Sequence, residues 1–318
     1  MRYGFYLPTR GATATAESLS RILRLGEAHG FASVMVADHI AFPVVVKSRY
    51  PYTVSGDFPG GGDALEQLAL MAFVAGQTTT LRIVSSVMIV PYRNPVFTAK
   101  ALATIDVLSN GRVTVGAGVG WMREEFEALA APDFDHRGSV TDEYLKIFKL
   151  LWTESPATFK GRFYEFSDLK CLPHPVQKPH PPIWIGGHSA PAIRRAARLG
   201  DGWHPVGANP AVPLRPAELK ASLEELDRLT REAGRDPSQL TISYKAPVYD
   251  TTAVTLDGKE RRPFTGFVDQ VVEDIGTWKK LGVSELIFDF RSDALDDTLD
   301  RMERFATTVK RAADRAGV

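Results

Sequence analysis

The sequence is poor in cysteine and has no excess of charge. Cys171 is the one cysteine among 318 residues, which excludes a disulfide within the chain and fits a reducing compartment. The 38 Lys and Arg residues balance the 38 Asp and Glu residues, and the two signs are interspersed along the sequence. A broad positive surface for nucleic acid or an anionic membrane is therefore not expected, so we expect a small-molecule partner.

Long apolar runs are missing as well. No segment reaches the roughly 20 apolar residues that a membrane helix needs. The first residues enter a strand-like run at 3–7 without a charged leader and an apolar segment before it. These absences lead us to expect a soluble, cytoplasmic protein. His174, His180 and His188 stand among prolines and glycines rather than on one helix face, so no metal site is expected.

Short β-branched or aromatic runs alternate with longer stretches of helical period. The helical stretches are clear in places, for example at Leu19, Ile22, Leu23 and Gly26, and a hairpin is predicted within 157–169. The predicted strands are 3–7, 33–37, 82–87, 112–117, 182–186, 202–205, 240–249 and 285–290. Eight such units predict an α/β protein, a single-domain (β/α)8 TIM barrel with loop insertions over residues 1–318.

In barrels of this kind the active site lies on the loops that follow the strands. Asp38 and His39 directly follow the second predicted strand. An imidazole titrates near neutral pH, so His39 is the candidate catalytic acid or base, and the Asp38 carboxylate could fix its tautomer. The alternative is a histidine at the barrel rim that bonds only to backbone.

Two glycine segments follow later strands. The run from Gly116 to Gly120 lacks the dinucleotide spacing, but Gly118 and Gly120 would let a flat ring lie close to the backbone. The alternative for this run is a tight turn. Gly186, Gly187, His188 and Ser189 lead into a helix whose free amides form a candidate phosphate site, unless they form only a structural turn.

Several segments together resemble the bacterial luciferase-like superfamily, and they follow one another in the order in which that superfamily carries them. They are residues 4–8, 36–39, 84–95, 108–112, 116–121, 184–187 and 200–203. The resemblance implies a luciferase-like TIM barrel, in a superfamily of flavin-dependent monooxygenases and deazaflavin-dependent oxidoreductases. The segment 118–121 followed by 123–126 is similar to the branch that is assigned to coenzyme F420.

The resemblance also implies roles for single residues. A cis peptide against the cofactor ring would fall at Ser86-Val87, the phosphate position matches Gly186, Gly187 and Ser189, and His39 matches a histidine beside the reactive ring. Sugar-phosphate dehydrogenases of the superfamily carry a glutamate where this chain has Trp121. A sugar phosphate is therefore not the expected substrate, and Trp121 is expected to line an apolar substrate site, with rim packing as the alternative.

Three functions remain open at this point. The first is an F420-dependent oxidoreductase that transfers a hydride to or from a small organic substrate, with His39 moving the proton. The second is an FMN-dependent monooxygenase that uses reduced flavin and O2. The third is a non-catalytic barrel that binds a flavin-type ligand. A homodimer is an open expectation from the relatives, and the loops 42–62 and 251–264 are expected to set the substrate.

Overall fold

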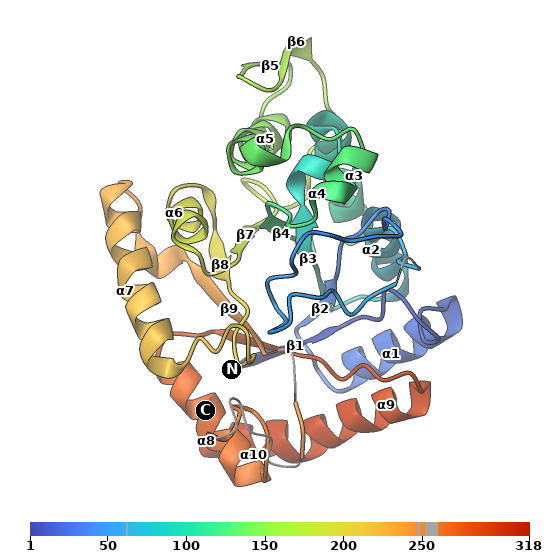
Figure 1. The fold of residues 1–318 in the computed structure, drawn as a ribbon, viewed down its shortest axis with the longest axis vertical. Helices are drawn as coiled ribbons and strands as arrows, with labels where there is room; N and C mark the ends of the chain where they lie inside the picture. Colours follow the sequence, from blue (N-terminus) through green and yellow to red (C-terminus); the bar gives the residue numbers. More distant parts are fainter. Residues whose placement is uncertain (62, 247–248, 252–259) are drawn as a thin grey trace.

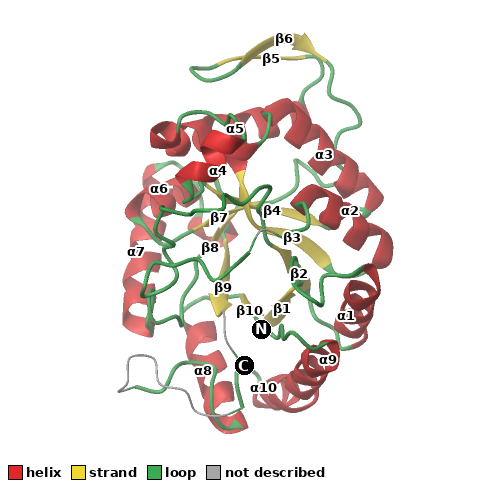
Figure 2. Cartoon of the chain, turned by 45° about the vertical axis from the view of Figure 1, so that its right-hand side comes forward, coloured by secondary structure: helices red, strands yellow, loops and turns green. Residues whose placement is uncertain are grey.

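The computed structural model describes residues 1–61, 63–246, 249–251 and 260–318. Eight parallel strands close into a barrel in the order β1-β10-β9-β8-β7-β4-β3-β2, with helices around it (Figures 1 and 2). The strands are β1 Arg2–Tyr6, β2 Ser33–Val36, β3 Arg82–Ile89, β4 Val113–Gly118, β7 Ile183–Gly186, β8 Gly202–His204, β9 Thr241–Ala246 and β10 Glu285–Phe288. The expected (β/α)8 barrel is confirmed.

Helix α3 begins at a signal that the sequence carries. Asn94 accepts hydrogen bonds from the amides of Val96 and Phe97, and Pro95 opens α3, as expected of a cap and first-turn proline. The main helices are α1 Ala16–Ala28, α2 Gln67–Gln77, α3 Pro95–Leu108, α5 Arg137–Thr153, α6 Ala190–Leu199, α7 Pro216–Glu232, α8 Val268–Lys280 and α9 Leu295–Arg304. A short helix, α4 Arg123–Ala128, follows β4, and α10 Arg311–Ala316 lies at the end of the chain.

The predicted hairpin is present outside the barrel. Strands β5 Ala157–Lys160 and β6 Glu165–Leu169 pair antiparallel and project away from the helices (Figure 2). The Glu143 carboxylate of α5 accepts hydrogen bonds from the amides of Arg162, Phe163 and Tyr164. This carboxylate ties the turn of the hairpin to the barrel.

Some predicted boundaries differ from the structure. Helix α2 begins at Gln67 because Glu66 caps it, and the Asp63 carboxylate accepts the Gly11 amide. The strand expected over 240–249 ends at Ala246, and residues 247–248 lie outside the described part of the chain. Such boundaries depend on caps and loop contacts rather than on periodicity.

The barrel interior is closed below the strand ends. Met35, Val84, Trp184 and Ile287, from four different strands, pack together with Tyr6 at their edge. Their sequence neighbours pack between the strands and the helices, so by the alternation of side chains these four face inward. This apolar layer forms a floor beneath the carboxyl ends of the strands.

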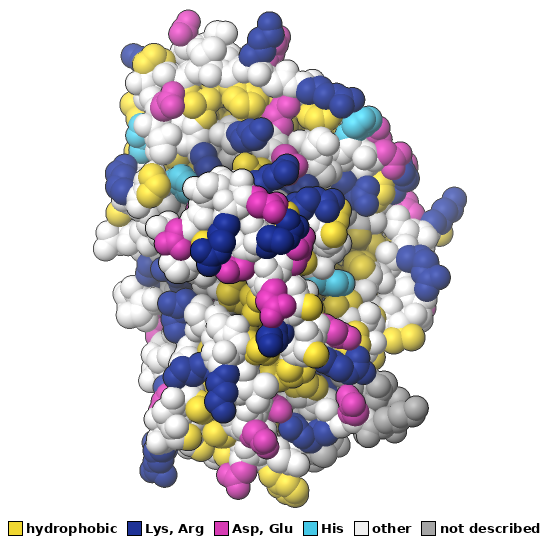
Figure 3. Space-filling view, turned by 90° about the vertical axis from the view of Figure 1, so that its left-hand side faces the viewer, with side chains coloured by type: hydrophobic (Ala, Val, Ile, Leu, Met, Phe, Trp, Pro, Cys, Tyr) yellow, Lys and Arg dark blue, Asp and Glu magenta, His cyan; other side chains and the backbone are white. Residues whose placement is uncertain are grey.

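The outside of the molecule is mixed in charge. On the face shown in Figure 3, Lys and Arg side chains alternate with Asp and Glu. Within the described residues, we find no helix of the length and apolarity needed to cross a membrane.

Candidate active site

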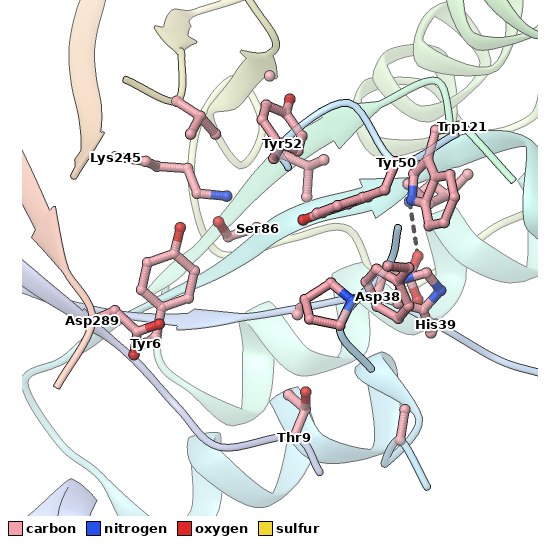
Figure 4. A pocket seen from close by; sticks show the side chains of 18 of the residues that line it. Tyr6, Thr9, Asp38, His39, Tyr50, Tyr52, Ser86, Trp121, Lys245 and Asp289 are labelled. Atoms are coloured by element: carbon pink, nitrogen blue, oxygen red, sulfur yellow. Dashed lines mark hydrogen bonds between the residues drawn. The ribbon is translucent and has the colours of Figure 1, made fainter. Parts of the chain in front are cut away.

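A cavity of about 330 Å³ opens at the carboxyl ends of the barrel strands (Figure 4). Its wall combines strand ends with the loop that follows β2. The described residues that line it include Tyr6, Arg10, Asp38, His39, Tyr50, Tyr52, Phe58, Ser86, Val87, Trp121, Gly186, Gly187, His204, Lys245, Asp289 and Arg291. The structure therefore brings His39, Ser86, Val87, Trp121, Gly186 and Gly187 together, as expected.

His39 is held by a carboxylate on another element. Its Nδ1 lies 2.8 Å from Oε2 of Glu125, which is fully buried in the first turn of α4. The same carboxylate accepts the Ile40 and Ala41 amides at 2.7 and 3.1 Å and the Tyr92 hydroxyl at 2.8 Å. Burial alone would raise the pKa of Glu125, but the hydrogen bonds from His39 and Ile40 outweigh it and hold that pKa below its usual range.

These contacts fix which nitrogen of His39 is free. An ionised carboxylate only accepts hydrogen bonds, so Nδ1 carries the proton and donates it to Glu125. The Nε2 atom is then the one available to a bound molecule. The imidazole is 13% exposed, and the rings of Phe42, Phe58 and Trp121 stand 4.5, 5.1 and 6.4 Å from it. His39 thus presents one nitrogen in a largely apolar surrounding.

Asp38 does not orient His39, contrary to our expectation. Its carboxylate accepts the Ile89 amide at 2.8 Å and two hydrogen bonds from Arg93, at 2.9 and 2.7 Å. It therefore holds the end of β3, and Arg93 also binds Glu66. The residue that orients His39 is Glu125, which lies in the resembling segment 123–126 but was not among the expected site residues.

The peptide between Ser86 and Val87 is cis, as the resemblance implied. The pairing of β3 with β4 is irregular between Ser85 and Met88, so the strand bulges at this point. The Val87 side chain lies against two glycines: a Cβ at Gly118 or at Gly186 would come within 2.5 or 2.7 Å of it. Gly118 thus makes room for Val87.

Gly118 and Gly120 do not line the cavity among the described residues, contrary to our expectation of cofactor contacts. The backbone of Gly120 has a φ of 85°, and a Cβ there would meet Phe126 at 2.6 Å and Ile89 at 2.8 Å. Side chains of the protein fill the space beside both glycines. Their role in this structure is packing and turn formation.

Ser86 is tied to a buried histidine. Its Oγ lies 3.2 Å from Nε2 of His204, whose Nδ1 lies 3.0 Å from the Ser243 hydroxyl oxygen and 3.1 Å from the Ser243 carbonyl oxygen. The carbonyl oxygen can only accept, so Nδ1 carries a proton. Burial, and then the charge of Lys245, lower the pKa of His204 well below its ordinary value. The ring is therefore neutral, Nδ1 donates to the carbonyl, and Nε2 accepts the Ser86 hydroxyl proton. The lone pairs of the Ser86 oxygen remain available to a donor in the cavity.

The start of α6 adjoins this wall. Gly187 has a φ of 88°, and Trp203 donates to its carbonyl at 2.7 Å. Ser189 is the N-cap, but its side chain makes no capping hydrogen bond. Nδ1 of His188 is buried without a hydrogen-bond partner in the described part of the chain. His188 and Ser189 lie just beyond the cavity lining, and their unused polar atoms beside helix amides fit an anionic tail of a ligand held at Gly186 and Gly187.

The family follows from comparison of the whole sequence. The family model of the luciferase-like monooxygenases matches residues 1–253. The chain belongs to the luciferase-like monooxygenase family. An uncharacterized protein of Mycobacterium tuberculosis is 34% identical to it over 253 residues, 79% of this chain and 83% of that protein. The FMNH2-dependent dimethylsulfone monooxygenase of Pseudomonas putida is 33% identical over 152 residues, 47% of this chain and 41% of that enzyme.

Solved structures share the fold of this luciferase-like chain. The monooxygenase RslO1 from Streptomyces bottropensis superposes with a TM-score of 0.78 at 21% identity, covering 98% of this chain and 99% of that one. An F420-dependent secondary alcohol dehydrogenase, in complex with an F420-acetone adduct, superposes with a TM-score of 0.76 at 19% identity. The superposition covers 97% of this chain and 98% of that one. At such identities the likeness shows a common fold.

The luciferase-like chain offers no clustered ligand set for a resident metal in its described part. Among the residues that the structure describes, no three His, Cys, Asp or Glu side chains gather as a metal site would require. Much of the segment 251–264, expected to help set the substrate, lies outside the described residues. The other expected loop, 42–62, does reach the cavity through Tyr50, Tyr52 and Phe58.

Proposed function

We propose that the chain is an oxidoreductase that uses coenzyme F420 for hydride transfer to or from a small organic substrate. The observation that carries this proposal is the His39–Glu125 pair, which leaves one imidazole nitrogen facing the cavity. Hydride transfer to a carbonyl, or from an alcohol, needs a proton to be moved at the same site. His39 is placed to move that proton.

The residues that would hold the cofactor lie along one wall. Ser86 and Val87 would flank the ring, Gly186 and Gly187 would lie along the chain that follows it, and His188 and Ser189 would meet the phosphate. When bound, F420 supplies or accepts the hydride. The Ser86 oxygen, with its proton directed to His204, would accept a hydrogen bond there.

The remaining residues would orient the substrate and exclude water. Phe58 and Trp121 lie 5.4 Å apart between ring centroids and screen the imidazole of His39 from solvent. In this position the neutral His39 would take a proton on Nε2 from a hydroxyl, and its imidazolium form would give that proton to a carbonyl oxygen. Glu125 would stabilise the imidazolium in both directions. Trp121 would offer an apolar surface to the substrate.

The comparisons support two cofactors. The fold is shared with an F420-dependent alcohol dehydrogenase over nearly the whole chain, which supports our choice. The identity with an FMNH2-dependent monooxygenase supports the second candidate, a reduced-FMN and O2-dependent monooxygenase. A third candidate, a non-catalytic barrel that binds a flavin-type ligand, requires binding without turnover.

Titration of the purified protein with F420 and with FMN, followed by tryptophan fluorescence, separates the cofactors because Trp121, Trp184 and Trp203 stand at or near the cavity. We expect saturable quenching with F420 at lower concentration than with FMN. Tight binding of FMN with none of F420 would reverse the choice. Binding of either without turnover of alcohols, aldehydes or enones in a substrate panel would favour the non-catalytic candidate.

A further inference from the structure

The wall of the cavity away from His39 carries a buried cation. Lys245, on β9, is 8% exposed, and its side chain lines the cavity. In Figure 4 its ammonium and the hydroxyl of Tyr6 point into the same part of the cavity. The ammonium lies 5.2 Å from the centre of the Tyr6 ring. Among the described residues, neither the ammonium of Lys245 nor the hydroxyl of Tyr6 has a hydrogen-bond or ion-pair partner.

The carboxylate that acts on the charge of Lys245 is already engaged. Asp289 binds Arg291 with both oxygens, at 2.8 and 2.6 Å, so its charge is matched by that guanidinium. The Arg291 guanidinium also lies over the Tyr6 ring, 5.1 Å from its centre. The charges of Asp289 and Arg291 therefore cancel, and the positive charge of Lys245 is not balanced by this pair.

Other charges around the cavity do not supply the missing anion. Asp38 is paired with Arg93, and Glu125 is paired with His39 on the far side. Arg10, which lies 4.9 Å from the centre of the Phe58 ring, adds a further positive charge to the lining. Outside these pairs, the described lining is left with the positive charges of Lys245 and Arg10.

An uncompensated ammonium in a buried position is costly unless a ligand provides the opposite charge. Burial, and then the charge of Arg291, lower the pKa of Lys245 to about 8. Burial raises the pKa of Tyr6 well above its ordinary value, so the phenol keeps its proton and can donate it. A cation and a neutral donor that share one space form a receptor for an anionic group.

We propose that Lys245 and Tyr6 bind an anionic group of the substrate, which makes the substrate a small organic acid. This inference rests on the proposed function, because it assigns the substrate of that same site. The anionic group lies at Lys245, the apolar part of the molecule contacts Phe58 and Trp121, and the reacting carbon lies toward His39. One ammonium and one hydroxyl match the two oxygens of a singly charged carboxylate, which is therefore the favoured anion, and sulfonates and phosphate monoesters are the alternatives.

Binding of small aromatic probes to the protein without cofactor tests the site directly. Benzoate, benzenesulfonate, phenyl phosphate and the neutral benzamide are titrated against tryptophan fluorescence. We expect benzoate to bind roughly 10- to 100-fold more tightly than benzamide, the range of a lost charge-assisted hydrogen bond. Tighter binding of phenyl phosphate or benzenesulfonate than of benzoate overturns the assignment to a carboxylate, and equal binding of benzamide overturns the anion site altogether.

Substitutions then test the two residues. Lys245→Met nearly keeps the length of the side chain and removes its charge. We expect it to weaken the binding of benzoate about 10- to 100-fold and to leave the binding of benzamide unchanged. Tyr6→Phe removes only the hydroxyl, and a loss of roughly 3- to 10-fold is expected. Lys220→Met, on the exposed side of α7, removes the same charge and should have no effect. Equal benzoate affinity in Lys245→Met and wild type would refute the proposal.

The same variants are titrated with F420 and FMN. We expect their cofactor affinities to match the wild type. A loss of cofactor affinity in Lys245→Met, with benzoate unaffected, would place the cation at the cofactor and overturn the inference. Preserved benzoate binding in a protein that binds neither cofactor would instead overturn the proposed function and leave the anion site standing.

Discussion

Nδ1 of His39 lies 2.8 Å from Oε2 of Glu125, and this contact joins the loop after β2 to the first turn of α4. The carboxylate is held from the other side by the amides of Ile40 and Ala41 and by the Tyr92 hydroxyl. Because all its partners are donors, the carboxylate stays ionised and fixes both the orientation and the tautomer of the imidazole. The pair therefore determines which atom of His39 can exchange a proton with a substrate.

Replacement of Glu125 by glutamine should reduce activity without removing the fold. The amide side chain has nearly the same shape, but it cannot match the charge of an imidazolium, and its NH2 group would face a donor. We expect kcat to fall roughly 100-fold, within the range of general acid–base effects, with unchanged cofactor affinity. Glu127→Gln, on the exposed side of the same helix, is the control. Wild-type kcat in Glu125→Gln would refute the role of the pair.

Removal of the His39 imidazole should lower kcat at least as much as Glu125→Gln does. We expect His39→Ala to lower kcat roughly 100- to 10,000-fold, because the proton then has no acceptor or donor at this place. Cofactor binding, measured by tryptophan fluorescence, should persist, since the proposed cofactor contacts lie on β3 and at the start of α6. Added imidazole should restore part of the activity in the cavity that the substitution leaves. Full activity of His39→Ala would show that another group moves the proton.

The barrel could be predicted because its signals are local. Each strand and each helical stripe, such as Leu19 to Gly26, is visible within a window of about a dozen residues. The barrel then places the strand ends together, so His39, Ser86, Gly186 and Trp121 could be assigned to one site without knowing any distance.

Contacts between distant loops could not be predicted. Glu125 is 86 residues from His39, and Asp38, the nearer carboxylate in sequence, turns away to Arg93. The space beside Gly118 is filled by Val87, which depends on the local bulge of β3. Lys245 meets Tyr6 only because the barrel closes through β10. These contacts depend on the directions of side chains in loops and across the strands that close the barrel. The periodicity of hydrophobic residues in the sequence does not contain that information.

The buried ammonium of Lys245 should make stability depend on pH. Its pKa is about 8 in the folded chain, lowered from 10.5 by burial and then by Arg291, with Asp289 acting in the opposite direction. Between these values the unfolded chain binds more protons than the folded one, so the free energy of unfolding rises with pH through this window. The full cost of the buried charge is present below pH 8.

Lys245→Met removes that cost, and at pH 7 it should stabilise the protein by on the order of 3 kcal/mol. The difference from wild type should shrink as pH rises from about 8 toward 10.5, because the wild-type lysine loses its proton there. Urea unfolding at a series of pH values measures this difference. A constant difference across the series would mean that folding does not shift the pKa of this lysine.

Gly116 should tolerate no side chain, because it faces the backbone of the neighbouring strand. A Cβ there would lie 2.0 Å from the Ser85 carbonyl oxygen, and β3 and β4 cannot separate without opening the barrel. We expect Gly116→Ala to lower the free energy of unfolding by about 3 kcal/mol or more. Gly76, exposed near the end of α2, is the matched control, because a Cβ at that position would meet no atom within 4 Å. Gly76→Ala should raise stability by up to about 1 kcal/mol, because alanine favours the helix. Urea unfolding compares the two variants, and equal stability would show that β3 can move away from β4 at this point.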